Sequence, residues 1–217
     1  MKNDVDLQRD VFDELKWEPA VHSTHIGVIV KDGVVTLEGT VDSYPEKWAA
    51  ERAVKRVAGV KALAEELEVR IPGSGKQTDA DVAEAAENAL KWDVLVPSDR
   101  IKVTVEKGFL TLEGQVDWEY QRSAAKKAVL NLEGVTGVAN EITLKPKVAP
   151  IDVKAKIEAA LKRNAILDAQ QIKVQADGGK VTLRGYVSSW TERDEAEGAA
   201  WSAPGVSEVK DLITVTD

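Results

Sequence analysis

The chain has 217 residues, of which 43% are hydrophobic, so it has enough apolar residues to form buried cores. It contains no cysteine, which excludes disulfides, thiolate chemistry and cysteine-ligated metal. Its net charge of −8 disfavours general binding to nucleic acid or to an anionic bilayer, although local patches can differ. No window approaches the roughly 18 consecutive apolar residues of a membrane-spanning helix. The N-terminus is acidic where a secretory signal is basic and then apolar, so we expect the chain as given to be cytoplasmic, and periplasmic only if a leader was removed.

The first predicted element is an amphipathic helix with apolar residues at helical spacing, namely Leu7, Val11 and Leu15. Two strands with alternating apolar residues follow, at 26–30 and 35–41. Asp32 and Gly33 lie between them, and glycine supplies the positive φ of a tight hairpin turn. Gly39 lies inside the second strand, where we expect a helix or backbone to approach closely.

A second helix is predicted next, opened by a capping box of Ser43 and Glu46. Gly59 ends this helix, and a third strand follows to Val69. The order α-β-β-α-β makes the second helix a crossover, which predicts that the second and third strands are parallel.

This unit occurs three times without a gap, and 14 of its 64 columns are identical in all copies. The copies cover 6–69, 81–144 and 152–215. Most shared columns are apolar or glycine, as expected for duplicated units that keep one fold. Pro, Gly and Ser mark the segments between copies as linkers. We therefore predict three domains, 1–70, 81–145 and 152–217, joined by linkers at 71–80 and 146–151.

The shared phrase G-x-x-T-L-x-G-x-V begins at Gly33, Gly108 and Gly179, and each copy continues with a helix of spaced alanines and then Gly-Val. This pattern resembles the BON family of bacterial domains, and the resemblance covers 192 of the 217 residues. It implies an α+β fold of three tandem α-β-β-α-β modules, each with a three-stranded mixed sheet packed by two helices. It also implies phospholipid association, envelope maintenance or a part in osmotic stress.

Catalytic patterns are weak, and we expect no enzyme activity, no catalytic residue, no metal site and no cofactor. His22 and His25 are the only histidines, and the sequence places no cysteine or carboxylate cluster beside them, so an ordinary loop before a strand is the favoured interpretation. The repeated glycines lack the lysine and Ser/Thr of a phosphate-binding loop. Carboxylates mostly occupy alternating, solvent-facing positions such as Glu66 and Glu68.

Aromatic residues that differ between the copies are the first candidates for contact. Trp118 occupies the column of Ser43 and Ser189, with Tyr120 beside it, and acts either as a hydrophobic staple or as an anchor for a partner or membrane. Trp17 and Trp92 share a column at the end of the first helix, where they either pack against an adjacent module or form a lipid-facing rim.

Two more tryptophans and a basic cluster complete the candidates. Trp48 and Trp201 lie on second helices and are candidates for packing between modules. The copies have net charges of −5, −4 and −1, so the third is nearly neutral. Its first helix is basic, which indicates either a solvated helix face or contacts for an acidic headgroup or partner, namely Lys154, Lys156, Lys162 and Arg163.

The sequence thus predicts a non-enzymatic binding or adaptor protein that associates with a phospholipid surface or a protein partner in envelope or osmotic stress. The alternative is a structural protein that self-assembles into a homo-oligomer, in ring- or pore-like form, through exposed sheet edges and the tryptophans that differ between the copies.

Overall fold

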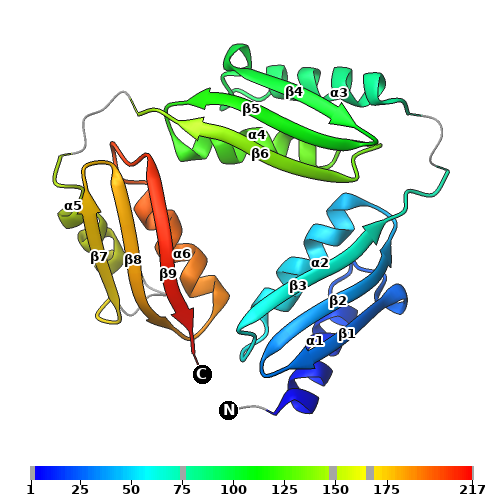
Figure 1. Ribbon diagram of the computed structural model, residues 1–217, viewed down its shortest axis with the longest axis horizontal. Helices are drawn as coiled ribbons and strands as arrows, with labels where there is room; N and C mark the ends of the chain where they lie inside the picture. The colour runs from blue at the N-terminus through cyan, green and yellow to red at the C-terminus, as the bar shows by residue number, and fades with distance from the viewer. Residues whose placement is uncertain (1–2, 74–76, 147–150, 165–168, 217) are drawn as a thin grey trace. The chain divides into compact units, whose positions relative to one another are not determined.

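The computed structural model describes residues 3–73, 77–146, 151–164 and 169–216. These residues form three modules with the same order of helices and strands (Figure 1). Module 1 contains α1 (Asp4–Trp17), the 3-10 turn η1 (Ser23–His25), β1 (Ile26–Lys31), β2 (Val34–Val41), α2 (Tyr44–Arg56) and β3 (Ala62–Val69). Module 2 contains α3 (Asp79–Trp92), η2 (Ser98–Arg100), β4 (Ile101–Glu106), β5 (Phe109–Val116), α4 (Glu119–Leu130) and β6 (Gly137–Leu144). Module 3 contains α5 (Val153–Arg163), β7 (Ile172–Asp177), β8 (Lys180–Val187), α6 (Trp190–Trp201) and β9 (Glu208–Val215).

Each module has one three-stranded sheet, in the orders β1-β2-β3, β4-β5-β6 and β7-β8-β9. The first two strands form an antiparallel hairpin in every module. The third strand is parallel to the central one in modules 2 and 3, because the intervening helix crosses over the sheet. The mixed sheet and the α+β fold are therefore confirmed.

The core of each module lies between one face of its sheet and its two helices. In module 2 the first helix contributes Val82, Ala86 and Leu90, which are all at most 2% exposed. Leu110 and Leu112 of β5 are fully buried beneath them. Burying a leucine contributes about 1.5–3 kcal/mol, so the repeated apolar columns account for the repeated fold. The other, outer face of each sheet presents the polar residues that alternate with the apolar ones along the strands.

The conserved glycines of the repeat have backbone roles. Gly33 (φ 80°) and Gly108 (φ 75°) occupy the hairpin turns, as predicted. In the central strands, a Cβ at Gly39, Gly114 or Gly185 would collide with a backbone carbonyl of the preceding strand or its entrance. The predicted close approach inside this strand is thus confirmed.

No helix within the described residues is long and apolar enough to cross a bilayer.

Candidate binding surfaces

The helix entrances show how Trp118 is accommodated. In modules 1 and 3 a serine hydroxyl accepts a hydrogen bond from the third helical residue, Ser43 from Glu46 N (3.3 Å) and Ser189 from Glu192 N (3.2 Å). Trp118 has no hydroxyl, and in module 2 the Gln121 side chain instead accepts from the backbone N–H of Trp118 at 3.1 Å. The reciprocal half of the cap therefore holds this helix end without the serine.

Trp118 and Tyr120 lie together at this helix entrance. Their rings are nearly parallel, with centroids 6.5 Å apart and 25° between the planes. Trp118 is half-buried, whereas Tyr120 is 54% exposed. Both the staple and the anchor interpretations of Trp118 therefore stay open.

The basic residues of α5 lie on its solvent side. The helix buries Val153, Ile157 and Leu161 against the sheet. The predicted contact residues are all exposed, namely Lys154, Lys156, Lys162 and Arg163. Lys154 pairs with Glu158 at 3.7 Å, and this exposed pair contributes little stability. Along the described part of the chain, the other three cations make no ion pair, so their charge is available to an external anion.

The shared tryptophan column lies at the C-terminal end of the first helix in both modules that keep it. Trp17 is 81% exposed and Trp92 is 86% exposed. The two indoles have different surroundings. Trp17 lines a shallow depression with the ion network of Glu14, Glu18 and Arg56. Arg56 contacts these carboxylates at 2.8 and 2.9 Å, and its hydrogen bond lowers the pKa of Glu18.

Trp92, by contrast, belongs to an apolar tip, which we define as Trp92, Val94 and Leu95. Val94 is 98% exposed and Leu95 is 53% exposed. The Asp93 carboxylate accepts a hydrogen bond from Leu95 N (2.9 Å), and Val96, only 8% exposed, returns the chain to the core. Three of the four residues from 92 to 95 are therefore large, apolar and exposed, and the fourth is Asp93.

The sequence analysis identified Trp92 but missed Val94 and Leu95. Their columns hold Pro19 and Ala20 in module 1, so the change to larger aliphatic residues beside a kept tryptophan was the available signal. An exposed tryptophan with adjacent aliphatic residues is typical of a surface that binds a membrane interface or a protein partner.

Trp48 and Trp201 are both half-buried on their helices. The Trp201 indole N–H donates to Glu197 Oε1 at 3.1 Å within α6. The prediction that these two residues pack between modules stays a prediction.

A second surface absent from the sequence analysis is the outer face of the module 3 sheet. Lys173 of β7 lies directly opposite Arg184 of β8, and Lys210 of β9 lies one pair further along. Like charges opposite each other on a sheet are destabilising, and none of these three cations makes an ion pair among the described residues. Tyr186 (59% exposed) and Leu212 (40% exposed) lie on the same face. The net charge of the module does not reveal this positive face, because the acidic residues of α6 offset the cations in the sum.

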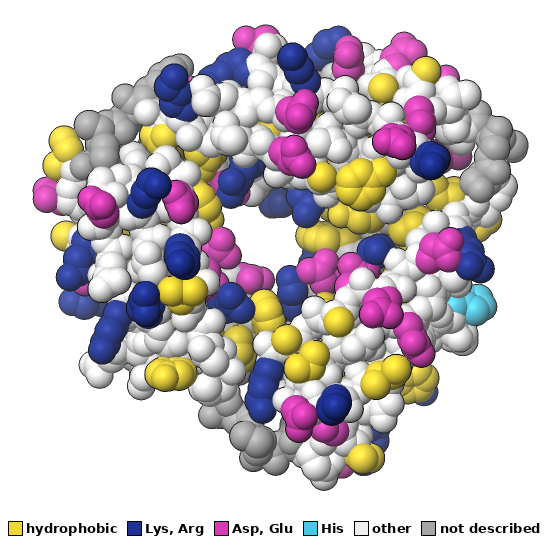
Figure 2. All heavy atoms as spheres, in the orientation of Figure 1, with side chains coloured by type: hydrophobic (Ala, Val, Ile, Leu, Met, Phe, Trp, Pro, Cys, Tyr) yellow, Lys and Arg dark blue, Asp and Glu magenta, His cyan; other side chains and the backbone are white. Residues whose placement is uncertain are grey.

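The equivalent face of module 2 has the opposite sign. Lys102 lies opposite Glu113, and Glu113 lies beside Glu141 in the parallel pair. Over the face of the molecule drawn in Figure 2, basic and acidic side chains are interspersed. The sign of the surface charge therefore differs from module to module and does not follow the net charge of the whole protein.

Three copies of one small α+β module, each with its own set of exposed aromatic and charged residues, define a tandem-repeat protein. The family model for the BON domain matches residues 3–71, 78–146 and 152–217. The chain belongs to the BON domain family.

Among curated proteins, the chain is 34% identical over 129 residues to the osmotically-inducible protein Y of Escherichia coli, a match that covers 58% of this chain and 64% of that protein. It is 29% identical over 170 residues to the outer membrane lipoprotein DolP of Haemophilus influenzae, covering 75% and 86% of the two chains. Among solved structures, CdsD of the type III secretion system of Chlamydia trachomatis aligns with 16% identity and a TM-score of 0.27 over 97% of this chain and 92% of that one, which is too low to support an argument.

Proposed function

We propose that this protein binds the surface of anionic phospholipid membranes without catalysing a reaction. The observation that carries the proposal is the apolar tip of module 2, where Trp92 and Val94 are 86% and 98% exposed. Water contact with three large apolar side chains is unfavourable, and insertion into the headgroup region of a bilayer relieves it. An indole is well suited to this depth because its ring is apolar and its N–H is polar.

The energy of such an insertion is modest. Full burial of one large apolar side chain is worth about 1.5–3 kcal/mol, and an interfacial position recovers only part of it. Each basic residue near an anionic surface adds about 1 kcal/mol. The unpaired cations of α5 and those of the module 3 sheet face are local sources of such attraction, despite the overall net charge of −8.

One relative is named an osmotically-inducible protein. Another is named an outer membrane lipoprotein, which favours the cell envelope as the place of this activity. We extend that setting to this chain as part of the proposal, in place of the cytoplasmic location expected from the N-terminus. Fractionation of the native host with an antibody to the protein tests it, and recovery only with soluble cytoplasmic proteins would reject the envelope setting.

Vesicle co-sedimentation tests the lipid proposal. The purified chain is mixed with vesicles of phosphatidylglycerol and phosphatidylethanolamine, or with neutral phosphatidylcholine vesicles, at low and high salt. We expect binding to the anionic vesicles that weakens as salt screens the charges. Trp92→Ser with Leu95→Ser should lower the partition coefficient about tenfold, which corresponds to about 1.4 kcal/mol.

Trp17→Ser is the matched control, since its indole is as exposed as that of Trp92 but lies beside an ion network. It should leave the partitioning close to that of the unmodified chain. Equal losses from both variants would show that the tip has no special part, and absence of binding at low salt would reject the proposal.

Self-association is the second candidate, because the outer sheet faces of modules 2 and 3 have opposite charge. Lys173, Arg184 and Lys210 of one copy would face Glu113 and Glu141 of another. Light scattering at low and high salt tests it. A mass that rises with concentration and falls with salt supports this candidate, and a strict monomer over a wide concentration range rejects it.

A further inference from the structure

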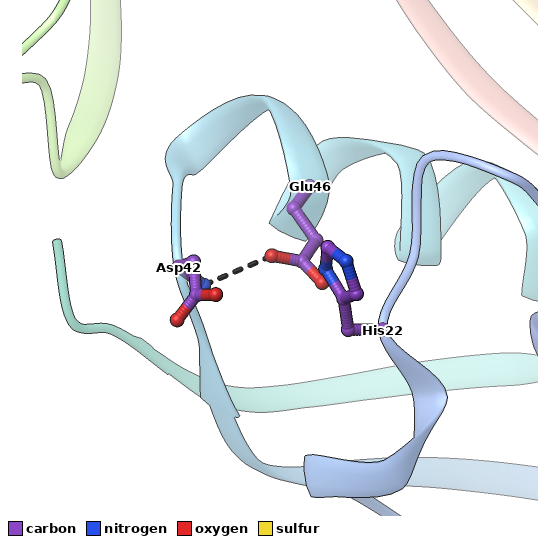
Figure 3. A group of neighbouring side chains, drawn as sticks. All are labelled: His22, Asp42 and Glu46. Carbon is purple, nitrogen blue, oxygen red and sulfur yellow. Dashed lines mark hydrogen bonds between the residues drawn. The ribbon is translucent and has the colours of Figure 1, made fainter. Parts of the chain in front are cut away.

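Three potential metal ligands meet in module 1, at the entrance of its second helix. His22 precedes η1, Asp42 follows β2, and Glu46 lies in the first turn of α2 (Figure 3). One ligand atom from each lies within 4.8 Å of the others. Glu46 is only 5% exposed, while His22 and Asp42 are exposed. The site is thus a half-open group with one imidazole and two carboxylates.

The fold fixes Glu46 firmly. Glu46 Oε2 accepts a hydrogen bond from Asp42 N at 2.9 Å, and the Glu46 N–H donates to Ser43 Oγ. In Figure 3 the carboxylate lies between the Asp42 backbone and the His22 ring. The side chain is therefore held in place by the helix cap, and it faces the histidine.

Capping alone does not require the negative charge of Glu46. In module 2 the same position is Gln121, whose neutral side chain accepts from Asp117 N at 3.0 Å. A buried carboxylate is more costly to keep than an amide. A cation beside the buried Glu46 carboxylate would offset this cost.

In module 2 the position equivalent to this site is occupied by an ion pair. Asp117, in the column of Asp42, receives both amino groups of the Arg100 guanidinium at 3.0 and 3.2 Å. Module 1 has His25 in the column of Arg100, and the Asp42 carboxylate makes no ion pair among the described residues. Module 2 thus combines one carboxylate with a built-in cation, whereas module 1 combines two carboxylates with an imidazole.

We infer that His22, Asp42 and Glu46 bind a divalent transition-metal ion, with Zn²⁺ as the best fit. Histidine nitrogen and carboxylate oxygen are both zinc ligands, the imidazole favours zinc over Mg²⁺ or Ca²⁺, and three protein ligands leave a fourth position to water. Ligand bonds of about 2.0–2.2 Å place tetrahedral ligand atoms about 3.4 Å apart. Reaching this spacing requires side-chain movement, and the His22 and Asp42 side chains are both exposed.

The ion takes the electrostatic place of the Arg100 guanidinium and ties the segment after α1 to the start of α2. The inference is independent of membrane binding. Its consequence is stability, because a ligand that binds only the folded state raises the unfolding free energy by mass action.

Titration calorimetry with ZnCl₂ on the tag-free full chain tests the site, together with the melting temperature with and without the ion. We expect one ion per chain and a raised melting temperature. His22→Gln and Asp42→Asn should each weaken the affinity by roughly tenfold or more. Glu46→Gln should do the same while keeping the cap, as Gln121 does in module 2. Since the chain has no cysteine and two histidines, few other zinc sites compete.

Glu192→Gln in module 3 is the matched control, because Glu192 caps α6 in the same way but has no histidine in the corresponding column. It should leave the Zn²⁺ affinity unchanged. No binding by the unmodified chain, or equal binding by the His22→Gln and Asp42→Asn variants, would overturn the inference.

Discussion

Substitution of Gly185 by alanine should destabilise module 3 severely. Gly185 lies in the middle of β8 with φ 143°, a region that alanine rarely adopts. A Cβ there would collide with the backbone carbonyl of Gln171, at the entrance of β7. A residue with a Cβ in this positive-φ region costs about 1–3 kcal/mol, and the collision is with backbone, which moves only if the hairpin opens. We expect a total loss above about 3 kcal/mol.

Gly198→Ala in the same module is the matched control. Gly198 lies within α6, and a Cβ there would meet no atom within 4 Å. The change should stabilise the helix by about 0.5–1 kcal/mol, since glycine is a poor helix former.

Urea denaturation of the full chain, followed by near-ultraviolet circular dichroism, measures both effects. The melting temperature provides a second measure, since 1 kcal/mol shifts it by about 4–8 °C in a domain of this size. Similar stabilities for Gly185→Ala and the unmodified chain would refute the close-approach account of the glycine that all modules share.

Three further predictions concern other parts of the chain. Arg56→Ala should destabilise module 1 at neutral pH. The Arg56 hydrogen bond lowers the pKa of Glu18, so its stabilisation is present above the unfolded-state pKa and is lost as the pH falls through the folded value. In urea denaturation the difference from the unmodified chain should shrink below about pH 4.3, and a constant difference would contradict the ion pair. Gln121→Ala should cost about 0.5–2 kcal/mol by leaving helix-entrance N–H groups without their acceptor; thermal melts measure this, and an unchanged midpoint would exclude the cap. Lys156→Gln with Arg163→Gln should weaken binding to anionic vesicles and reduce its dependence on salt, whereas an unchanged salt dependence would remove α5 from the contact surface.

The fold was largely predictable because its determinants are local and repeated. The helices follow from apolar residues such as Leu7 and Val11, which are now seen to be at most 2% exposed. The hairpin follows from alternation and from Gly33, whose φ is 80°. Agreement of three copies removed the ambiguity that one short apolar run would have left.

The surfaces were less predictable, because they depend on which residues share a face. The positive sheet face of module 3 appears only when the register places Lys173 opposite Arg184. The apolar tip depends on the Asp93 turn, which directs Val94 and Leu95 outward.

The proposed metal ligands of module 1 illustrate the same limit over a longer distance. His22 and Glu46 are separated by a complete hairpin in the sequence, and the fold brings their ligand atoms within 4.8 Å of each other. Their spacing along the sequence therefore could not predict that these two side chains lie close together.

The partition coefficient on phosphatidylglycerol-containing vesicles tests the proposed membrane association most directly. It is measured side by side for the unmodified chain, for the double variant Trp92→Ser with Leu95→Ser, and for Trp17→Ser. We predict binding by the unmodified chain and by Trp17→Ser, and a loss of about tenfold for the double variant. Undiminished binding by the double variant, or no sedimentation of the unmodified chain at low salt, would contradict the proposed function.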